Sequence, residues 1–452
     1  MMEIQEFKSR VFQAGQGAGL EEMEIYFSHS RSFSTRIFQK EVDDYRVSVE
    51  QGVGFRARFQ GKVGYAYAET LDDESVDLLI DGAKANAQII DSDDDIEFFP
   101  GSPEYPEVVA FDPGIEAVTA EEKIEFAKTL ETEAFATDER VSMVNWATAG
   151  YGETEVYMAN TKGLEQSFRR NGAYSFVSAV VRQGEQVKTG LRMVFGNDWA
   201  QFDAKKLARE AVQEATSLLG AESLPSGDYP VLLRHDVAQD LLATFASVFS
   251  AEAVQKGLSL LAGKLEQPIA STLVTLVDDP LLKNGGASAS FDGEGVATRA
   301  KNVIEKGKLI TFLHNLKTAK KDGVESTGNA SRASFKSPVG ISPTNFFIQP
   351  GTLDYEALIE RMGDGIIIIN VQGLHSGADA VSGDFSLGAY GYLVENGAIV
   401  RPIEQITIAG NFFKLLEVVE AIGSDLEFGS PSSRGHVGSP SLLIRHLSVA
   451  GN

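Results

Sequence analysis

The first half of the chain carries two segments in which alternating apolar residues are followed by a helical pattern. Residues 55–68 alternate as the strands of a hairpin, and residues 73–90 carry an apolar side chain at every third or fourth position. Residues 174–194 and then 203–219 show the same two patterns in the same order. Alternation with a period of two predicts strands, and the longer spacing predicts amphipathic helices. Each segment is therefore predicted to form a hairpin followed by a helix.

The two predicted helices share the spacing of their apolar residues. The matching positions are Leu79, Ala83, Ala87 and Ile90 in the first helix and Leu207, Ala211, Ala215 and Leu218 in the second. This similarity indicates a weak internal repeat, in which two sheet-plus-helix units pack around one shared core. A chance recurrence of small residues on two helices is the alternative interpretation.

A proline-rich acidic segment separates the two copies. Residues 91–114 contain four prolines and an aspartate run at residues 93–95, and they lack the glycine and distal glutamate of a calcium-binding loop. Proline blocks helix and removes ladder donors, so we predict an extended, solvated loop. A helix over residues 120–136 should follow, because Thr119 and Glu122 have the spacing of a capping box.

The second half of the chain is predicted to be a separate domain. Gly, Ser and Pro cluster in residues 219–230, which places a boundary near residue 224 and divides the chain into residues 1–223 and 224–452. The expected elements are a strand at 229–233, a long helical stretch at 237–261, a hairpin turning at Lys306-Gly307, a short helix at 353–362, a buried strand at 365–371, a hairpin turning at Asn396-Gly397 and a helix at 412–422 capped by Asn411. Strands and helices do not alternate regularly, so the predicted class is α+β with two domains.

Composition excludes several classes of function. The 452 residues carry 40 basic and 64 acidic side chains, a net charge of −24, which argues against a nucleic-acid partner. The chain has no cysteine, and its longest aliphatic run, residues 366–369, is far too short to span a membrane. The charged N-terminus does not resemble a signal peptide, so we expect a cytoplasmic protein without membrane contacts.

Common catalytic motifs are missing from the sequence. There is no HExxH, no G-x-S-x-G and no phosphate-binding G-x-x-x-x-G-K-[ST]. His235 and Asp240 would lie about 140° apart on a regular helix, too far round to share one metal ion. Asp236 and Asp240 share a face, which is more typical of acidic residues at a helix start.

The densest polar segment follows the predicted buried strand. Residues 373–388 read GLHSGADAVSGDFSLG. Polar loops at the ends of buried strands often carry function, so five residues are candidates for peptide binding or for a subunit interface. They are His375, Ser376, Asp379, Ser382 and Asp384. The alternative is a tight turn in which Asp and Ser side chains bond nearby amides.

Four segments of the sequence resemble the TldD/TldE family, specifically its TldE branch, also called PmbA. They read GLHSGADAVSGDFSLGAYGYLVENG, SPSLLIRHLSVAGN, DDPLLKNGGASASFDGEG and GVGFRARFQGKVGYAYAETL. The resemblance implies a two-subunit cytoplasmic metalloprotease that degrades or trims peptides, and an older name for the family is modulator of DNA gyrase. Its TldD-type subunit carries zinc ligands and a glutamate base in an HExxxH motif, with a downstream cysteine, whereas the TldE-type chain is the partner.

This chain departs from the zinc motif. By resemblance the motif falls within residues 239–250, where its six positions read Ala243-Thr244-Phe245-Ala246-Ser247-Val248. Alanine, phenylalanine and valine cannot bind zinc, and nothing replaces the glutamate base. The resemblance thus implies no catalytic residue and no metal in this chain, with zinc in a TldD-type partner.

Three hypotheses about function follow, in order of preference. In the first, the chain is a non-catalytic subunit of a TldD/TldE-type zinc protease, with a TldD-like chain and peptides as partners. In the second, it is a stand-alone binding or adaptor protein, in isolation a homodimer, that acts on a peptide or on gyrase without proteolysis. In the third, it is an independent hydrolase that uses residues such as His375, Asp379 and Asp384.

Overall fold

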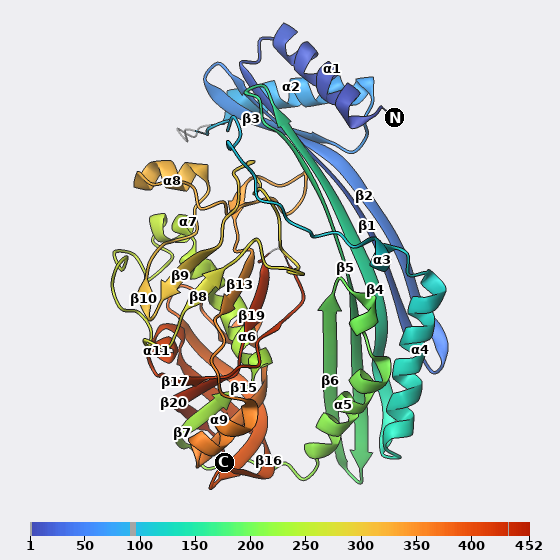
Figure 1. Ribbon diagram of the computed structural model, residues 1–452, viewed down its shortest axis with the longest axis vertical. Helices are drawn as coiled ribbons and strands as arrows, with labels where there is room; N and C mark the ends of the chain where they lie inside the picture. Colours follow the sequence, from blue (N-terminus) through green and yellow to red (C-terminus); the bar gives the residue numbers. More distant parts are fainter. Residues whose placement is uncertain (1, 91–95, 433) are drawn as a thin grey trace.

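The computed structural model describes residues 2–90, 96–432 and 434–452 (Figure 1). A long antiparallel sheet with strand order β3-β2-β1-β4-β5-β6 forms one side of the molecule. Its strands are β1 (Glu22–Phe38), β2 (Glu41–Phe59), β3 (Lys62–Ala68), β4 (Val141–Asn160), β5 (Glu165–Gln183) and β6 (Gln186–Gly196). Both predicted hairpins are confirmed, although their strands begin earlier than the sequence pattern indicated.

The two halves of this sheet have the same order of elements. In each half a helix precedes three strands and a second helix follows them, and β1 pairs with β4 where the halves meet. The helices are α1 (Ile4–Gly17) and α2 (Asp73–Ile89) in the first half, and α4 (Ala120–Thr137) and α5 (Ala204–Ser217) in the second. Figure 1 shows one helix pair at each end of the sheet. Short helices α3 (Pro113–Glu116) and η1 (Trp199–Gln201) complete this part.

The same close contact joins helix to sheet in both halves. A Cβ at Gly64 on β3 would lie 1.8 Å from the carbonyl oxygen of Ala83, and a Cβ at Gly190 on β6 would lie 2.0 Å from that of Ala211. Since any side chain at these glycines would overlap backbone, α2 and α5 approach their strands more closely than ordinary packing permits. The matching alanines of the two helices therefore fill equivalent positions.

The helix α4 begins at the residue that the sequence predicted. The Thr119 hydroxyl accepts the amide of Glu122, and the Glu122 carboxylate accepts the amide of Thr119, which confirms the predicted capping box. Residues 93–95 of the predicted acidic loop lie outside the described residues. Residues 96–112, which complete the connection to α3, contain no helix or strand.

The second half contains two further six-stranded sheets. One has the order β16-β15-β14-β7-β20-β17, and the additional pairing of β16 with β20 closes five of its strands into a ring. Its strands are β7 (Gly227–Leu233), β14 (Gly365–Gln372), β15 (Asp384–Glu395), β16 (Ala398–Asn411), β17 (Val419–Ile422) and β20 (Leu442–Ala450). The predicted strands at 229–233 and 365–371 and the turn at Asn396-Gly397 are confirmed, and both turn residues have positive φ.

The other sheet has the order β10-β9-β8-β13-β19-β18. Its strands are β8 (Leu276–Asp278), β9 (Lys301–Glu305), β10 (Lys308–Leu309), β13 (Asn345–Ile348), β18 (Glu427–Phe428) and β19 (His436–Ser439), and β11 (Ala330–Ser331) pairs separately with β12 (Gly340–Ile341). Helices of this half are α6 (His235–Phe245), η2 (Ala246–Phe249), α7 (Ala251–Gln255), α8 (Leu316–Asp322), α9 (Tyr355–Met362), α10 (Leu374–Gly377) and α11 (Phe412–Glu417). The α+β class predicted from the sequence is confirmed.

Two helix predictions are wrong in this half. The stretch 237–261 is not one helix, because α6 ends at Phe245 and two short helical turns follow. Asn411 does cap α11, accepting the amides of Phe413 and Lys414, but α11 ends at Glu417. The apolar residues after it belong to β17, where β-branched Val419 and Ile422 pair with β20. Helical spacing of apolar residues arose here from two short elements that face the same core.

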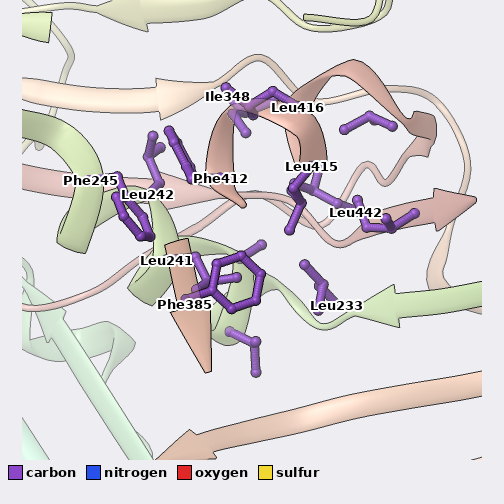
Figure 2. Close-up of a cluster of buried hydrophobic side chains, with 14 of the residues drawn as sticks. Leu233, Leu241, Leu242, Phe245, Ile348, Phe385, Phe412, Leu415, Leu416 and Leu442 are labelled. Atoms are coloured by element: carbon purple, nitrogen blue, oxygen red, sulfur yellow. The ribbon is translucent and has the colours of Figure 1, made fainter. Parts of the chain in front are cut away.

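That core lies between α6, α11 and the ring of strands (Figure 2). Phe245 at the end of α6 stacks on Phe412 of α11, with ring centroids 4.6 Å apart, and lies near Phe385 of β15. All three rings are buried. Among the described residues, no helix is both long enough and apolar enough to cross a membrane.

The close helix–strand contact predicts a large effect for one added methyl group. Replacing Gly190→Ala should lower the free energy of unfolding by about 1–3 kcal/mol, because the Cβ overlaps backbone of α5. Urea unfolding followed by tryptophan fluorescence would measure this, since Trp146 and Trp199 both lie in this half. The control is Gly152→Ala on β4, where a Cβ meets nothing within 4 Å. Equal stability of the two variants would contradict the prediction.

Candidate functional site

Two adjoining cavities lie where the long sheet faces the second half of the chain. Their volumes are about 450 and 360 Å³, and they share Arg170, Gly286 and Pro431 in their walls. The first cavity is lined mainly by β1, β4, β5 and β6, and the second mainly by loops of the second half. Pockets of this size between two structural units are typical of ligand sites. We therefore take these cavities as the candidate site.

A buried ion pair forms the sheet side of the site. Glu24 on β1 lies directly opposite Arg56 on β2 in the strand register. The Arg56 guanidinium donates to both carboxylate oxygens of Glu24, through Nε at 2.6 Å and Nη2 at 3.0 Å. Both side chains are buried. This two-point geometry is the strongest form of an arginine–carboxylate pair.

The ion pair continues into the second half of the chain. Arg332, which follows β11, donates from Nη2 to Glu24 Oε1 at 2.5 Å and from Nε to the carbonyl oxygen of Gly293 at 2.8 Å. Glu294 lies on the other side of Arg56, with Oε1 3.9 Å from Nη1. These four side chains, Glu24, Arg56, Glu294 and Arg332, form what we call the buried ion cluster. It joins the two halves of the chain beside the second cavity.

Asp292 lines the second cavity next to this cluster. Its carboxylate accepts three backbone amides, from Glu294, Val296 and Ala330, which tie the loop after residue 291 to β11. Burial, together with the nearby Glu294 carboxylate, raises the pKa of Asp292 to about 7. Burial also raises the pKa of Glu294. Burial thus opposes ionisation of both carboxyl groups, whereas the three amides favour the charged form of Asp292.

His436 of β19 lies behind the first cavity. The amide of Gly286 donates to its Nδ1 at 2.9 Å. Its ring stacks on Phe428 at 4.6 Å and meets Phe195 of β6 edge-on at 5.4 Å. Burial lowers the pKa of His436 to about 4, so the ring is neutral at pH 7. The contact with Phe195 makes His436 a second link between the halves.

The five candidates from the sequence lie elsewhere, and none of them lines either cavity. Asp379 Oδ1 accepts the amides of Val381 and Ser382, and the amide of Asp384 donates to the Ser382 hydroxyl. Asn411 donates to Asp384 at 2.9 Å, which helps to lower the pKa of that carboxyl.

His375 and Ser376 lie on α10 with exposed side chains, and the Ser376 hydroxyl donates to the carbonyl of Gly373 at 3.4 Å. The structure thus brings Asp379, Ser382 and Asp384 together as a local turn network, which was the alternative interpretation of this segment. Their role as a peptide-binding or interface site stays a prediction.

Asp236, at the start of α6, belongs to a structural ion-pair network. Asp236 accepts two hydrogen bonds from Arg234, at 2.8 and 2.5 Å, and Arg234 also pairs with Glu214 of α5 at 2.6 Å. Burial raises the pKa of Asp240 to about 6. Outside residues 1, 91–95 and 433, no group of three or more His, Cys, Asp or Glu side chains could hold a metal ion.

The cavity residues were largely missed from the sequence. Neither Arg170 nor Gly293, which line these cavities, belongs to a motif that the sequence singles out. Ser430 and Pro431, in the segment before His436, line the first cavity. Strand alternation could have separated Arg169 from Arg170, but it does not tell which face meets the second half.

Comparison with known proteins covers nearly the whole chain. Three family models match: PmbA/TldA metallopeptidase domain 1 over residues 23–87, the central domain over 113–219 and the C-terminal domain over 226–451. A metalloprotease PmbA homolog of Haemophilus influenzae is 26% identical, covering 93% of this chain and 90% of that protein. A metalloprotease TldD homolog of the same organism is 28% identical, with 95% and 92% covered.

Solved structures also match this chain along nearly its whole length. The crystal structure of a protein named as a modulator of a DNA gyrase from Thermotoga maritima is 36% identical, with a TM-score of 0.90 over 99% of this chain and 100% of that chain. TldE from Thermococcus kodakarensis also has a TM-score of 0.90, over 98% and 100% of the two chains. Its identity is 22%, so this second likeness concerns the fold alone.

The buried ion cluster predicts that the stability of the fold depends strongly on the carboxylate of Glu24. Changing Glu24→Gln leaves Arg56 and Arg332 buried without their shared partner, and should lower the free energy of unfolding by about 3–5 kcal/mol. The control is Glu22→Gln, two residues earlier on β1, whose ion pairs with Arg58 and Lys162 are partly exposed and contribute about 1 kcal/mol or less. Urea unfolding of both variants measures the difference, and a similar small loss in both would refute it.

Because His436 is buried in its neutral form, we predict that the folded chain loses stability in acid. Its pKa is about 4 in the folded chain and about 6.5 when unfolded, so its contribution is present above pH 6.5 and is lost as the pH falls toward 4. The expected slope is at most about 1.4 kcal/mol per pH unit. His436→Gln and His436→Phe, which cannot bind this proton, should both flatten the curve of unfolding free energy against pH. An unchanged curve would show that another group sets it.

Proposed function

Because the chain belongs to the PmbA/TldD metallopeptidase family, we propose that it is a non-catalytic, TldE-type subunit. In this proposal it pairs with a TldD-type zinc metalloprotease and supplies part of the wall around the peptide substrate. The family includes relatives named for both types, TldD and PmbA, which supports a partnership between two similar chains. The local geometry of residues 243–248 supports the TldE type for this chain.

The segment where the zinc motif would lie carries the proposal. Its six positions, residues 243–248, span the end of α6 and the start of η2. Phe245, Ala246 and Val248 are buried in the core, and the Thr244 hydroxyl donates to the carbonyl of Asp240 at 2.8 Å. Figure 2 shows Phe245 among the apolar side chains of α6 and α11.

These residues do not fit a zinc ion. A catalytic zinc site needs three nitrogen, oxygen or sulfur ligands and an open position for water. At residues 243–248 the buried side chains are hydrocarbon, and the helix that would present two ligands on one face ends at Phe245. We therefore assign no catalytic step to this segment, and zinc chemistry to the partner.

The rest of the chain is suited to a structural role beside a protease. The long sheet is fixed to the second half by the buried ion cluster and by pairs such as Arg234 with Glu214. This leaves rigid cavity walls built from strands and short loops. A subunit of this kind can hold a peptide and position its partner without touching the bond that is cleaved.

The test is a paired measurement on the purified full-length chain. Zinc is quantified by mass spectrometry, and peptide cleavage is assayed for this chain alone, for a TldD-type chain with HExxxH, and for the mixture. We expect no stoichiometric zinc in this chain and full cleavage only in the mixture. The matched control is a mixture in which the partner's motif glutamate is changed to glutamine, which should bind but not cleave.

Two outcomes would overturn the proposal. Zinc together with cleavage by this chain alone, lost in a folded Asp384→Ala variant, would favour an independent hydrolase. Failure to form any complex with the TldD-type chain, while peptide or gyrase binding is retained, would favour a stand-alone adaptor. Size-exclusion chromatography with light scattering separates these cases, since it also reports a homodimer.

A further inference from the structure

Arg170 on β5 occupies an unusual position between the two cavities. It lines both of them, together with Gly286 and Pro431. Its neighbour Arg169 points to the opposite face of the same strand, because side chains alternate along a strand. There Arg169 lies over the ring of Phe111 at 4.1 Å, near Glu116 at 3.7 Å and near Glu153 at 3.8 Å. The strand thus presents one arginine outward and one to the cavities.

The guanidinium of Arg170 has no partner for its charge. Across the part of the chain that the structure describes, it forms neither a hydrogen bond nor an ion pair, and its contact is with the ring of Phe168 at 5.9 Å. It is half-buried, and burial lowers its pKa. A desolvated cation without a counter-charge destabilises a fold, so its presence beside open volume needs an explanation.

Other charged groups around the cavities are already matched. Arg332 is bound to Glu24, and the oxygens of Asp292 accept three backbone amides. Glu153, in the first cavity, accepts the Tyr151 hydroxyl at 2.8 Å and pairs with Arg31 at 3.5 Å. Once these interactions are counted, one positive charge is left without a partner in the walls of the cavities.

From this arrangement we infer that Arg170 is the anchor for a carboxylate of a bound peptide. An arginine fork matches the two oxygens of a carboxylate, and the adjoining cavities give an extended peptide room on either side of the anchor. A single uncompensated cation balances one monovalent anion, whereas a phosphate group would bring more negative charge next to Asp292. The inference rests on the proposed peptide-handling role and adds to it the chemical group that is recognised.

Two sources of the carboxylate are possible, a free C-terminus or an acidic side chain, and three probes distinguish them. The probes are dansyl-labelled tetra-alanine with a free C-terminal carboxylate, the same peptide as the C-terminal amide, and an amide in which one alanine is glutamate. Binding is measured by fluorescence anisotropy to the full-length chain alone, and to its complex with a TldD-type partner whose motif glutamate is glutamine.

We expect at least one carboxylate probe to bind roughly ten- to one-hundredfold more tightly than the plain amide, as charge-assisted hydrogen bonds do. The preferred probe identifies the source. Arg170→Gln should abolish the preference, and Arg170→Lys should keep part of it. The matched control Arg169→Gln, on the other face of β5, should leave it unchanged. Melting temperatures of the two Arg170 variants should not fall, since Arg170 forms no ion pair that would be lost.

The inference is overturned if all three probes bind the wild-type chain and the complex alike, or not at all. It is also overturned if Arg170→Gln keeps the preference. The binding measurement needs no cleavage, so it is separate from the test of the proposed function. A chain that fails to pair with a TldD-type subunit, yet binds acid probes through Arg170, would refute the subunit role and retain the anchor.

Discussion

The contact on which the arrangement of this molecule depends is the buried carboxylate of Glu24, shared by Arg56 and Arg332. One arginine lies on the neighbouring strand of the long sheet, and the other comes from a loop 308 residues after Glu24 in the chain. Buried charges are costly unless they are fully paired, so the fold favours the placement of the two halves of the chain in which Arg56 and Arg332 both reach Glu24. The ion cluster thus helps to fix how the first half of the chain lies against the second, and the cavities lie beside it.

A second constraint acts within the long sheet. Gly64 and Gly190 on its outer strands let α2 and α5 approach to backbone contact. The two halves of the sheet therefore use the same pair of small residues, a glycine on the strand and an alanine on the helix. Close packing of this kind holds the helices at the two ends of the sheet (Figure 1). One face of the sheet lies against the second half, and α5 also reaches that half through Glu214 and Arg234. That face carries Tyr26, Phe168 and Arg170, which meet the loops of the second half.

The family assignment and the local geometry address different questions. Family membership rests on similarity along nearly the whole chain and extends to relatives of both the TldD and PmbA types. The proposed lack of catalysis rests instead on a few side chains at one helix end, where this chain places Phe245 and Val248 in the core. Chains that share one fold can therefore differ in chemistry, because function depends on the site and not on the fold.

The sequence by itself determined the local elements and the class of fold. Hairpins, the Thr119 capping box and the Asn396-Gly397 turn all depend on residues close together in the chain. Prediction from the sequence failed where the apolar spacing fits both a helix and a strand, as after Asn411. A short helix and a short strand that face one core give a similar pattern of apolar residues. Only the tertiary structure decided that Arg170 faces a cavity and that Arg332 reaches Glu24, because alternation along a strand gives two faces but does not say what lies against either.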